Sequence, residues 1–416
     1  VSKAFCIVQK KDNTMIELPA QSLLDTDLYK LTMQQAVLAK YPNVDVEYRW
    51  GNRNGTPFSN EAVDGIRECI ERMAELRASD EEIAALAKAC PFFTPSYLAY
   101  LKNYRFNPKE VEITQDNDDN FAATYRGKWH SDILWEIPGL YIPSAMHYTF
   151  DDTDWSDEGQ EALLREKGKF LWDCTFAEFG TRRRRNFASQ DRAVRILKDN
   201  PGFVGTSNVH LALKYGVKPI GTLAHEWPMI HQVLYGIRHC NRAAMQAWND
   251  VYKGNLGIAL PDTIGSDAFF ADFDGILSRL WDGTRHDSGD PYEYGDKAIG
   301  HYGKKVINPC SKSVVFSDGL RANADAAPDK NPNKIREYFE GRIKTSFGIG
   351  TDFTNDFPGS PALNIVIKPF SVNGIPVVKY PDSAGKAMGD PDAQRVVRYI
   401  SRGISLDTPL ASLKKR

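Results

Sequence analysis

Four consecutive arginines, Arg182 to Arg185, lie in the middle of the chain in the stretch FAEFGTRRRRNFA. A guanidinium group binds carboxylates and phosphates through a rigid fork of hydrogen-bond donors, so this run could hold a multiply charged anion. On its own, such a run is more often a solvated helix face or an RNA-binding patch. Whether it belongs to a catalytic site therefore depends on the residues that accompany it.

Residues that suit the same chemistry recur after successive short apolar segments. Glycine-rich turns at helix N-termini bind phosphate through backbone N–H groups, and aspartates suit ribose hydroxyls or Mg²⁺. These residue types are found at Glu178, Thr206, Ser207, Asn208, His225, Asp262, Arg285, Asp287, Asp290, Asp318, Gly319, Gly348, Gly350 and Thr351. Because they recur at the same end of successive segments, they favour a binding site for a multiply phosphorylated ribose.

Each of these signals also has a structural explanation when it is taken alone. A histidine before a helix, such as His225, is more often a capping or packing residue than a reactive one. The stretch DSGDP can be a helix N-cap with Pro291 in the first turn, and the glycines of FGIGT can simply end a strand. Away from the expected site we interpret His130, His147, His239 and His301 as structural, and we leave His210, His231 and His286 open.

The elements that would position these residues alternate along the chain. Apolar strands are expected to end near residues 177–181, 203–208, 219–226, 257–263, 284–290, 314–319 and 345–351, and helical segments follow most of them. This alternation predicts a parallel sheet with right-handed crossovers. Seven such units without a GxGxxG fingerprint favour an α/β barrel over a Rossmann sheet. In a barrel of this kind, the loops after the strands form the active site.

The parts of the chain before and after this alternating region have different sequence patterns. Residues 1–150 mix helices and strands and predict an α+β domain, with a capping box at Ser79 and Glu82. Residues 151–362 are expected to form the catalytic barrel. In residues 363–416, the stretch LNIVIKPFSVNGIPVVKY predicts a β-hairpin that turns at Asn373-Gly374 and returns to the first domain.

Composition excludes several classes of protein. A net charge of -2 over 416 residues argues against a nucleic-acid-binding protein that would use the arginine run. Six scattered cysteines without a C-x-x-C pair indicate neither a zinc site nor a disulfide framework, and they fit a cytoplasmic enzyme. No membrane span or signal peptide is expected. A metallohydrolase that uses His225, His286 and the aspartates remains an alternative, although an H-x-H ligand pair on a strand is missing.

Eight stretches in order closely resemble the nicotinate phosphoribosyltransferase family: LLDTDLYKLTMQQAV, EFGTRRRR, GTSN, GTLAHEW, TRHDSGDP, FSDGL, SFGIGT and LNIVIK. The resemblance implies an irregular α/β barrel of about seven strands, an N-terminal sandwich-like domain and a homodimer. It implies that nicotinate and phosphoribosyl pyrophosphate (PRPP) form nicotinate mononucleotide and pyrophosphate, with Mg²⁺ and ATP hydrolysis, for NAD biosynthesis. A nicotinamide or another pyridine phosphoribosyltransferase is the alternative.

The resemblance also implies roles for individual residues. His225 would be phosphorylated by ATP, and hydrolysis of this phosphohistidine would drive the transfer. Phe179 and Tyr29 of the partner subunit would sandwich the pyridine ring. Arg182, Arg285 and Arg53 would bind pyrophosphate or the base, and Asp287 the ribose hydroxyls. The remaining expected contacts are Asp262 for ribose or a metal, the rim residues Thr206 and Asp318, and Gly319, Gly348, Gly350 and Thr351 for the nucleotide phosphate.

Two further expectations concern orientation and specificity. On a helix that starts near residue 182, Arg182 would face the site, whereas Arg184 or Arg185 would be structural or contact ATP. Ser207 stands where the nicotinamide-using relatives have an aspartate, and a serine hydroxyl can donate to a carboxylate without adding negative charge. Because the ring nitrogen of nicotinate already carries a lone pair, catalysis is expected to depend on positioning and on stabilising the leaving charge.

Overall fold

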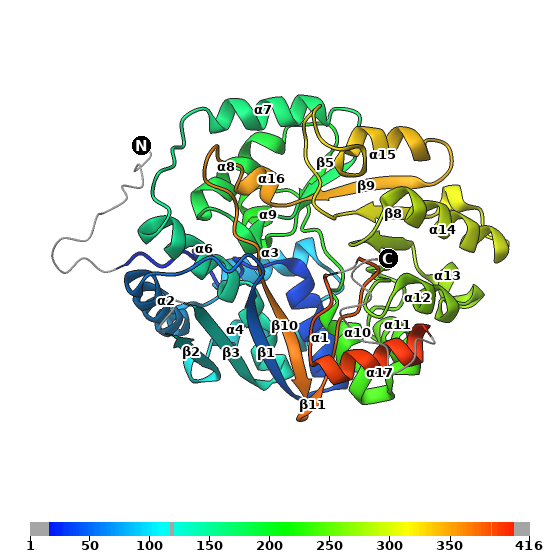
Figure 1. Ribbon diagram of the computed structural model, residues 1–416, viewed down its shortest axis with the longest axis horizontal. Coiled ribbons are helices and arrows are strands. Elements are labelled where there is room, and N and C mark those ends of the chain that lie inside the picture. The colour runs from blue at the N-terminus through cyan, green and yellow to red at the C-terminus, as the bar shows by residue number, and fades with distance from the viewer. Residues whose placement is uncertain (1–15, 117–119, 384, 403–416) are drawn as a thin grey trace.

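The computed structural model describes residues 16–116, 120–383 and 385–402. Cys6 and the terminal segment ASLKKR lie outside these ranges. None of the helices in the described ranges is long and apolar enough to cross a membrane. The chain forms two sheets with helices around them, and the N-terminal and C-terminal parts lie side by side in the lower sheet (Figure 1).

The first sheet is antiparallel and has the strand order β11-β10-β1-β3-β2. Its strands are β1 (Asp45–Asn52), β2 (Val111–Gln115), β3 (Phe121–Lys128), β10 (Ile365–Val372) and β11 (Ile375–Pro376). The β10–β11 hairpin turns at Asn373 and Gly374, which both have positive φ, as a type I′ turn requires. Val46 of β1 pairs with Val372 of β10, so the late part of the chain completes the sheet that the early part begins.

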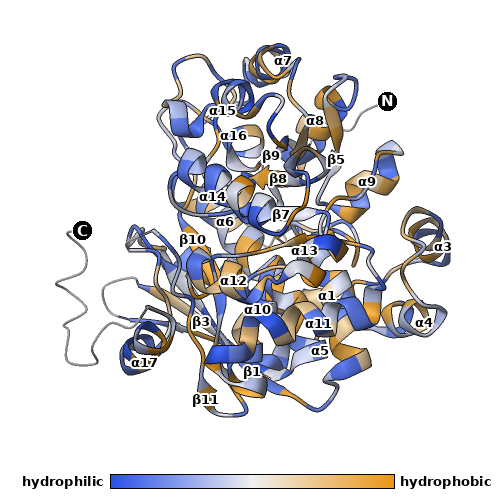
Figure 2. Ribbon diagram, turned by 90° about the vertical axis from the view of Figure 1, so that its right-hand side faces the viewer, coloured by the Kyte–Doolittle hydropathy of each residue, from blue (hydrophilic) through white to orange (hydrophobic). Residues whose placement is uncertain are grey.

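The second sheet is parallel and has the order β5-β4-β9-β8-β7-β6. Its strands are β4 (Phe176–Glu178), β5 (Phe203–Thr206), β6 (Ile258–Ala259), β7 (Gly283–His286), β8 (Ser313–Phe316) and β9 (Lys344–Ile349). Six of the seven strands expected from the sequence are therefore confirmed. In Figure 2, β8 is largely orange, as a buried strand should be, whereas much of the outer helix α17 is blue.

The strand expected at residues 219–226 is not formed. Pro219 makes a single parallel bridge with Thr206, and the chain then enters a helix. Proline has no N–H to donate to a ladder. Gly221 has a φ of 154° and passes close to the backbone of Tyr29, where a Cβ would lie 3.0 Å from the Tyr29 nitrogen. In the described part of the chain the paired strands therefore end at β5 and β6, and strand pairing does not close the sheet into a barrel.

Seventeen α-helices connect and cover the sheets in the described ranges. They are α1 (Leu28–Lys40), α2 (Asn60–Arg72), α3 (Asp80–Ala89), α4 (Pro95–Asn103), α5 (Trp129–Asp132), α6 (Pro138–Phe150), α7 (Gln160–Phe170), α8 (Phe187–Leu197), α9 (Val209–Tyr215), α10 (Glu226–Tyr235), α11 (Cys240–Tyr252), α12 (Ser266–Asp272), α13 (Gly275–Leu280), α14 (Pro291–Lys304), α15 (Pro332–Phe339), α16 (Thr351–Thr354) and α17 (Pro391–Arg402). The expected capping box of Ser79 and Glu82 opens α3. Residues 28–37 of α1 are all buried, so this helix is enclosed by the rest of the fold.

Candidate active site

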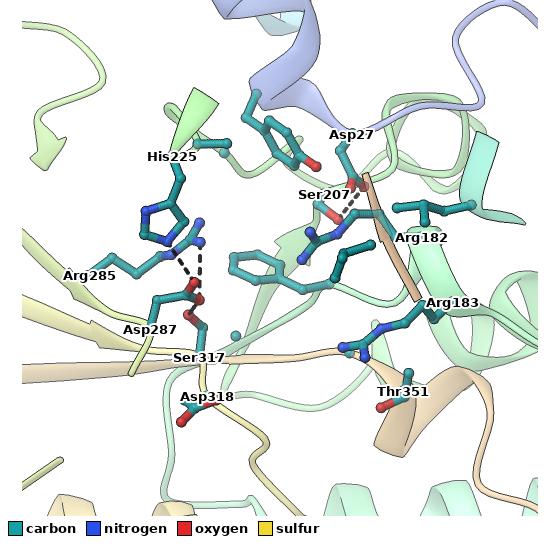
Figure 3. A pocket seen from close by; sticks show the side chains of 18 of the residues that line it. Asp27, Arg182, Arg183, Ser207, His225, Arg285, Asp287, Ser317, Asp318 and Thr351 are labelled. Carbon is teal, nitrogen blue, oxygen red and sulfur yellow. Dashed lines mark hydrogen bonds and ion pairs between the residues drawn. The ribbon is translucent and has the colours of Figure 1, made fainter. Parts of the chain in front are cut away.

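One pocket receives side chains from the loops after the parallel strands, from the start of α1 and from the region of β10 (Figure 3). Thirteen of the fifteen site residues expected from the sequence line it: Tyr29, Arg53, Phe179, Arg182, Ser207, His225, Arg285, Asp287, Asp318, Gly319, Gly348, Gly350 and Thr351. The carboxyl ends of parallel strands meet at one edge of a sheet, which explains why residues so distant in sequence converge.

The pocket is strongly cationic. Seven of its lining residues are arginine or lysine, against three aspartates. The cations are Arg53, Arg182, Arg183, Arg285, Lys368, Lys379 and Lys386, and the aspartates are Asp27, Asp287 and Asp318. Such an excess of fixed positive charge around a cavity suits a ligand with several negative charges.

His225 lies at the N-terminus of α10 and is held by three side chains. Its Nε2 is 2.9 Å from Asp287 Oδ2 and 3.3 Å from Asp262 Oδ1, and its Nδ1 is 3.2 Å from Thr263 Oγ1. Burial lowers the pKa of His225 to about 4, although the two carboxylates oppose this shift. The imidazole is therefore neutral near pH 7, the state in which it can act as a nucleophile.

Asp287 follows β7 and connects both sides of this cluster. It accepts hydrogen bonds from Arg285 Nη2 at 3.2 Å and from Ser317 Oγ at 3.1 Å, in addition to its contact with His225 (Figure 3). Burial alone would raise the pKa of Asp287, but Arg285 and His225, together with Lys379, outweigh it and hold the pKa well below its usual value. Asp287 is therefore an ionised acceptor at neutral pH.

His225, Asp262 and Asp287 each offer a ligand atom within 4.8 Å of one another, as a metal site would require. His225 Nε2 already contacts both carboxylates, however, and Lys379 Nζ lies 3.6 Å from Asp262 Oδ2 and 3.7 Å from Asp287 Oδ2. The lysine supplies the positive charge that a resident metal ion would otherwise provide. The cluster therefore does not support the metallohydrolase alternative.

The arginine run divides into two pairs. The helix expected from residue 182 is absent: Thr181–Arg183 form a 3₁₀ turn, Arg184 is extended, and α8 begins only at Phe187. Arg182 and Arg183 line the pocket and point into it (Figure 3). Arg184 and Arg185 are buried and turn away from it.

Arg184 and Arg185 bind protein groups. Both terminal nitrogens of Arg184 donate to Asp25, at 2.8 and 2.7 Å, which is the paired geometry that a guanidinium makes with a carboxylate. Arg185 donates to Ser360 Oγ at 2.6 Å and stacks 3.6 Å above the ring of Tyr148. The second half of the run is therefore structural, which decides between the two roles expected for it.

Replacing Arg184 with methionine is expected to reduce stability by about 3–5 kcal/mol, because it leaves the buried carboxylate of Asp25 without its partner. The exposed Arg165 offers a matched control, and Arg165→Met should change stability by no more than about 0.5 kcal/mol. Urea denaturation of both variants measures the difference. Equal stabilities would contradict a structural role for Arg184.

Tyr29, near the start of α1, and Phe179, just after β4, line the same pocket within one chain. The expectation that a partner subunit supplies Tyr29 is therefore wrong, because α1 packs against the loops that follow the parallel strands. Gly348 makes room for the Phe179 ring, since a Cβ at residue 348 would lie 2.3 Å from its ring carbons. This glycine supports the aromatic side chain as well as lining the pocket.

Ser207 donates a hydrogen bond of 2.7 Å to Asp27 Oδ1, and both residues line the pocket (Figure 3). The cap of α9 is Asn208, which accepts from Leu211 N at 3.0 Å, so Ser207 is not the capping residue. Burial raises the pKa of Asp27, and Arg182 opposes this shift. Asp27 was not expected from the sequence, although it stands in the recognised stretch LLDTDLYK.

Several residues singled out in the sequence lie behind the pocket. Thr206 donates to Glu178 Oε2 at 2.5 Å, and burial raises the pKa of this fully buried glutamate to about 7. Asp262 contacts His225 and accepts from Ser288 Oγ at 2.7 Å. Asp290 caps α14. Thr206 and Asp262 thus lie behind the lining residues and support the site, and the substrate contacts expected for both stay a prediction.

Three cations of the pocket, Lys368, Lys379 and Lys386, were not expected from the sequence. Arg183 belongs to the arginine run, whose sequence did not show whether this residue faces the site. The three lysines lie on or after β10, outside the alternating strands and helices of the parallel sheet. Lysine is about as frequent in this segment as in the rest of the chain, so these residues became informative only once the segment was placed beside the pocket.

Two family models match the chain. Residues 24–144 match the nicotinate phosphoribosyltransferase (NAPRTase) N-terminal domain, and residues 174–400 match the nicotinate phosphoribosyltransferase (NAPRTase) family. A nicotinate phosphoribosyltransferase of Methanosarcina mazei is 48% identical over 410 residues, covering 93% of this chain and 99% of the relative. One of Methanococcoides burtonii is 45% identical over 407 residues, again covering 93% and 99%.

Solved structures agree with the sequence matches. The crystal structure of nicotinate phosphoribosyltransferase from Porphyromonas gingivalis superposes with a TM-score of 0.88 at 35% identity, covering 92% of this chain and 100% of that one. A nicotinate phosphoribosyltransferase from Vibrio cholerae gives a TM-score of 0.85 at 35% identity, covering 93% and 94%. The likeness therefore extends over both sheets.

Proposed function

The chain belongs to the nicotinate phosphoribosyltransferase family, and we propose that its pocket joins nicotinate to PRPP with the help of ATP hydrolysis, for NAD biosynthesis. The observation that carries this proposal is the combination of seven cations, two aromatic side chains and a neutral histidine around one cavity. A multiply phosphorylated sugar, an anionic ring and a phosphoryl group each have chemically suited residues there. One chain supplies all of these residues, and the homodimer expected from the sequence stays a prediction.

In the transfer step, the pyridine ring lies between Tyr29 and Phe179, with Arg182 near its carboxylate. The lone pair of the ring nitrogen forms a bond to C1 of the ribose, while the C1–O bond breaks and its electron pair leaves with pyrophosphate. Cations such as Arg285 stabilise the charge that develops on the leaving group. The carboxylates of Asp287 and Asp318 line the same cavity and suit an Mg²⁺ ion that arrives with substrate phosphates.

In the ATP step, the neutral imidazole of His225 attacks the γ-phosphorus of ATP. An N–P bond forms, the bond to the bridging oxygen breaks, and ADP leaves with that electron pair. Asp287 orients the imidazole, and Lys379 beside it neutralises charge on the transferred phosphoryl group. Later hydrolysis of the N–P bond would make the overall transfer more favourable.

A product assay tests the proposal. Purified protein is incubated with PRPP and with nicotinate, nicotinamide or quinolinate, each with and without ATP and Mg²⁺, in the cytoplasmic pH range. We expect nicotinate mononucleotide as the main product, and faster formation with ATP. Preferential use of nicotinamide or quinolinate would overturn the substrate assignment, and equal rates with and without ATP would overturn only the ATP coupling.

Replacing Ser207 with aspartate is expected to impair nicotinate use selectively. The new carboxylate would lie beside Asp27, which is 2.7 Å from the present hydroxyl, and would repel the anionic substrate. We expect kcat/KM for nicotinate to fall at least about 100-fold, since like charges brought together cost several kcal/mol, while nicotinamide use stays the same or rises slightly. Ser207→Asn, which adds bulk without charge, serves as the control. Unchanged nicotinate kinetics in Ser207→Asp would contradict the specificity role.

A further inference from the structure

Glu136 is a buried carboxylate, 4% exposed, that lies at the meeting point of four side chains from other parts of the chain. One oxygen contacts Lys30 Nζ at 2.6 Å and accepts from Tyr29 OH at 3.4 Å. The other contacts Lys368 Nζ at 3.3 Å and Arg182 Nη1 at 3.7 Å. Of these four partners, Tyr29, Arg182 and Lys368 line the pocket, whereas Glu136 itself does not.

Glu136 is fixed from the side away from the pocket. Lys30, which is fully buried, binds both Glu136 and Glu226. Glu226 in turn accepts from Tyr48 OH at 2.5 Å and from Trp129 Nε1 at 2.6 Å. A carboxylate anchored in this way holds its other partners in one geometry, because its own position is determined by packing and by hydrogen bonds.

We propose that Glu136 is a positioning residue for nicotinate: its carboxylate keeps Lys368 charged and aims Arg182 and Lys368 at the end of the pocket where Tyr29 lies. This inference rests on the proposed function. Arg182 and Lys368 are both cations, so they repel each other when they approach one substrate carboxylate. The carboxylate of Glu136 contacts both of them but does not line the pocket, so it offsets this repulsion without competing for the substrate. The role is distinct from catalysis, since Glu136 touches no reacting atom.

The charged state of Lys368 provides a readout of this role. Burial lowers the pKa of Lys368 to about 8; the carboxylate of Glu136 counteracts this, and the charges of Arg182, Lys379 and Lys30 add to it. Removing the charge of Glu136 takes away the interaction that favours the ammonium form. The pKa of Lys368 then falls below about 8, and the ammonium loses its proton at a lower pH than in the wild-type protein.

The experiment measures kcat and KM for nicotinate in the full-length Glu136→Gln variant between about pH 6 and about pH 8.5. Above neutral pH we expect KM to rise about tenfold or more while kcat stays within about threefold, because binding geometry is lost and the reacting groups are untouched. The rise of KM with pH should begin at a lower pH than in the wild type. Glu110→Gln is the matched control, since Glu110 binds only Ser131 and Trp135 in the described structure and should leave both curves unchanged.

A second variant guards against loss of folding. Glu136→Gln leaves Lys30 paired with Glu226, so the buried charges beneath the pocket stay balanced. Glu136→Asp keeps the negative charge on a shorter side chain, and its rise of KM should begin at the same pH as in the wild type. A wild-type profile in a folded Glu136→Gln protein would overturn the inference and leave the proposed function intact. A wild-type enzyme that does not use nicotinate would overturn the proposed function itself.

Discussion

The His225→Asn variant is expected to lose all stimulation by ATP while it retains a slow, ATP-independent transfer. The asparagine amide can still donate to Asp287, which lies 2.9 Å from the imidazole, but it has no nucleophilic nitrogen. The pocket cations that bind PRPP and nicotinate remain in place. The ratio of the rates with and without ATP should therefore fall to about one.

Transfer of radiolabel from γ-labelled ATP gives an independent measurement. Acid-labile label should appear on the wild-type protein and be absent from His225→Asn. His210→Asn is the control, because His210 lies outside the pocket, near Glu82, and should label normally. An equal level of acid-labile label on His225→Asn would show that another residue accepts the phosphoryl group.

Arg182→Ala is expected to cause the largest loss of transfer itself. The guanidinium lies in the pocket, and its nearest acidic partner, Glu136, is 3.7 Å away, so its donors can reach a substrate. Tyr29 raises the pKa of Arg182, and the carboxylates of Glu136 and Asp27 add to this rise, whereas burial opposes it. Arg182 therefore keeps its positive charge at any working pH. Loss of one such stabilising group should reduce kcat/KM about 100- to 1,000-fold.

Arg182→Lys separates charge from geometry. The lysine keeps the positive charge but has no planar fork, so its loss should lie between that of the alanine variant and the wild type. Arg183→Ala tests the neighbouring side chain of the same 3₁₀ turn. If Arg182→Ala kept nearly full activity while Arg183→Ala lost it, the role would belong to Arg183.

The repeating part of the fold was predictable because most of its strands can be recognised from short local patterns in the sequence. Most of the six confirmed strands contain a short apolar segment, although β7 reads GTRH, and each is followed by a polar or glycine-containing loop. Residues 219–226 have the same appearance, but Pro219 lacks a donor and Gly221 follows the backbone of Tyr29. That outcome depends on a neighbour almost two hundred positions away, which local patterns do not contain.

The candidate site was predictable where its residues follow the parallel strands. Residues at the ends of parallel strands, such as His225 and Asp287, were found because topology brings those ends together. Asp27, Lys368 and Lys379 reach the pocket from α1 and from the segment around β10, so only the tertiary arrangement reveals them. The subunit that supplies Tyr29 was wrongly predicted for the same reason, since sequence distance does not show how α1 packs.

The pairing of β1 with β10 has a consequence for the order in which the protein folds. Val46 of β1 can pair with Val372 of β10 only after β10 has been synthesised. The edge of β1 that pairs with β10 therefore stays open until nearly the whole chain has left the ribosome. An open edge can pair with other chains, and contacts so distant in sequence form slowly. Folding of the N-terminal sheet is therefore a late event, and a nascent chain truncated before β10 should be aggregation-prone and a substrate for chaperones.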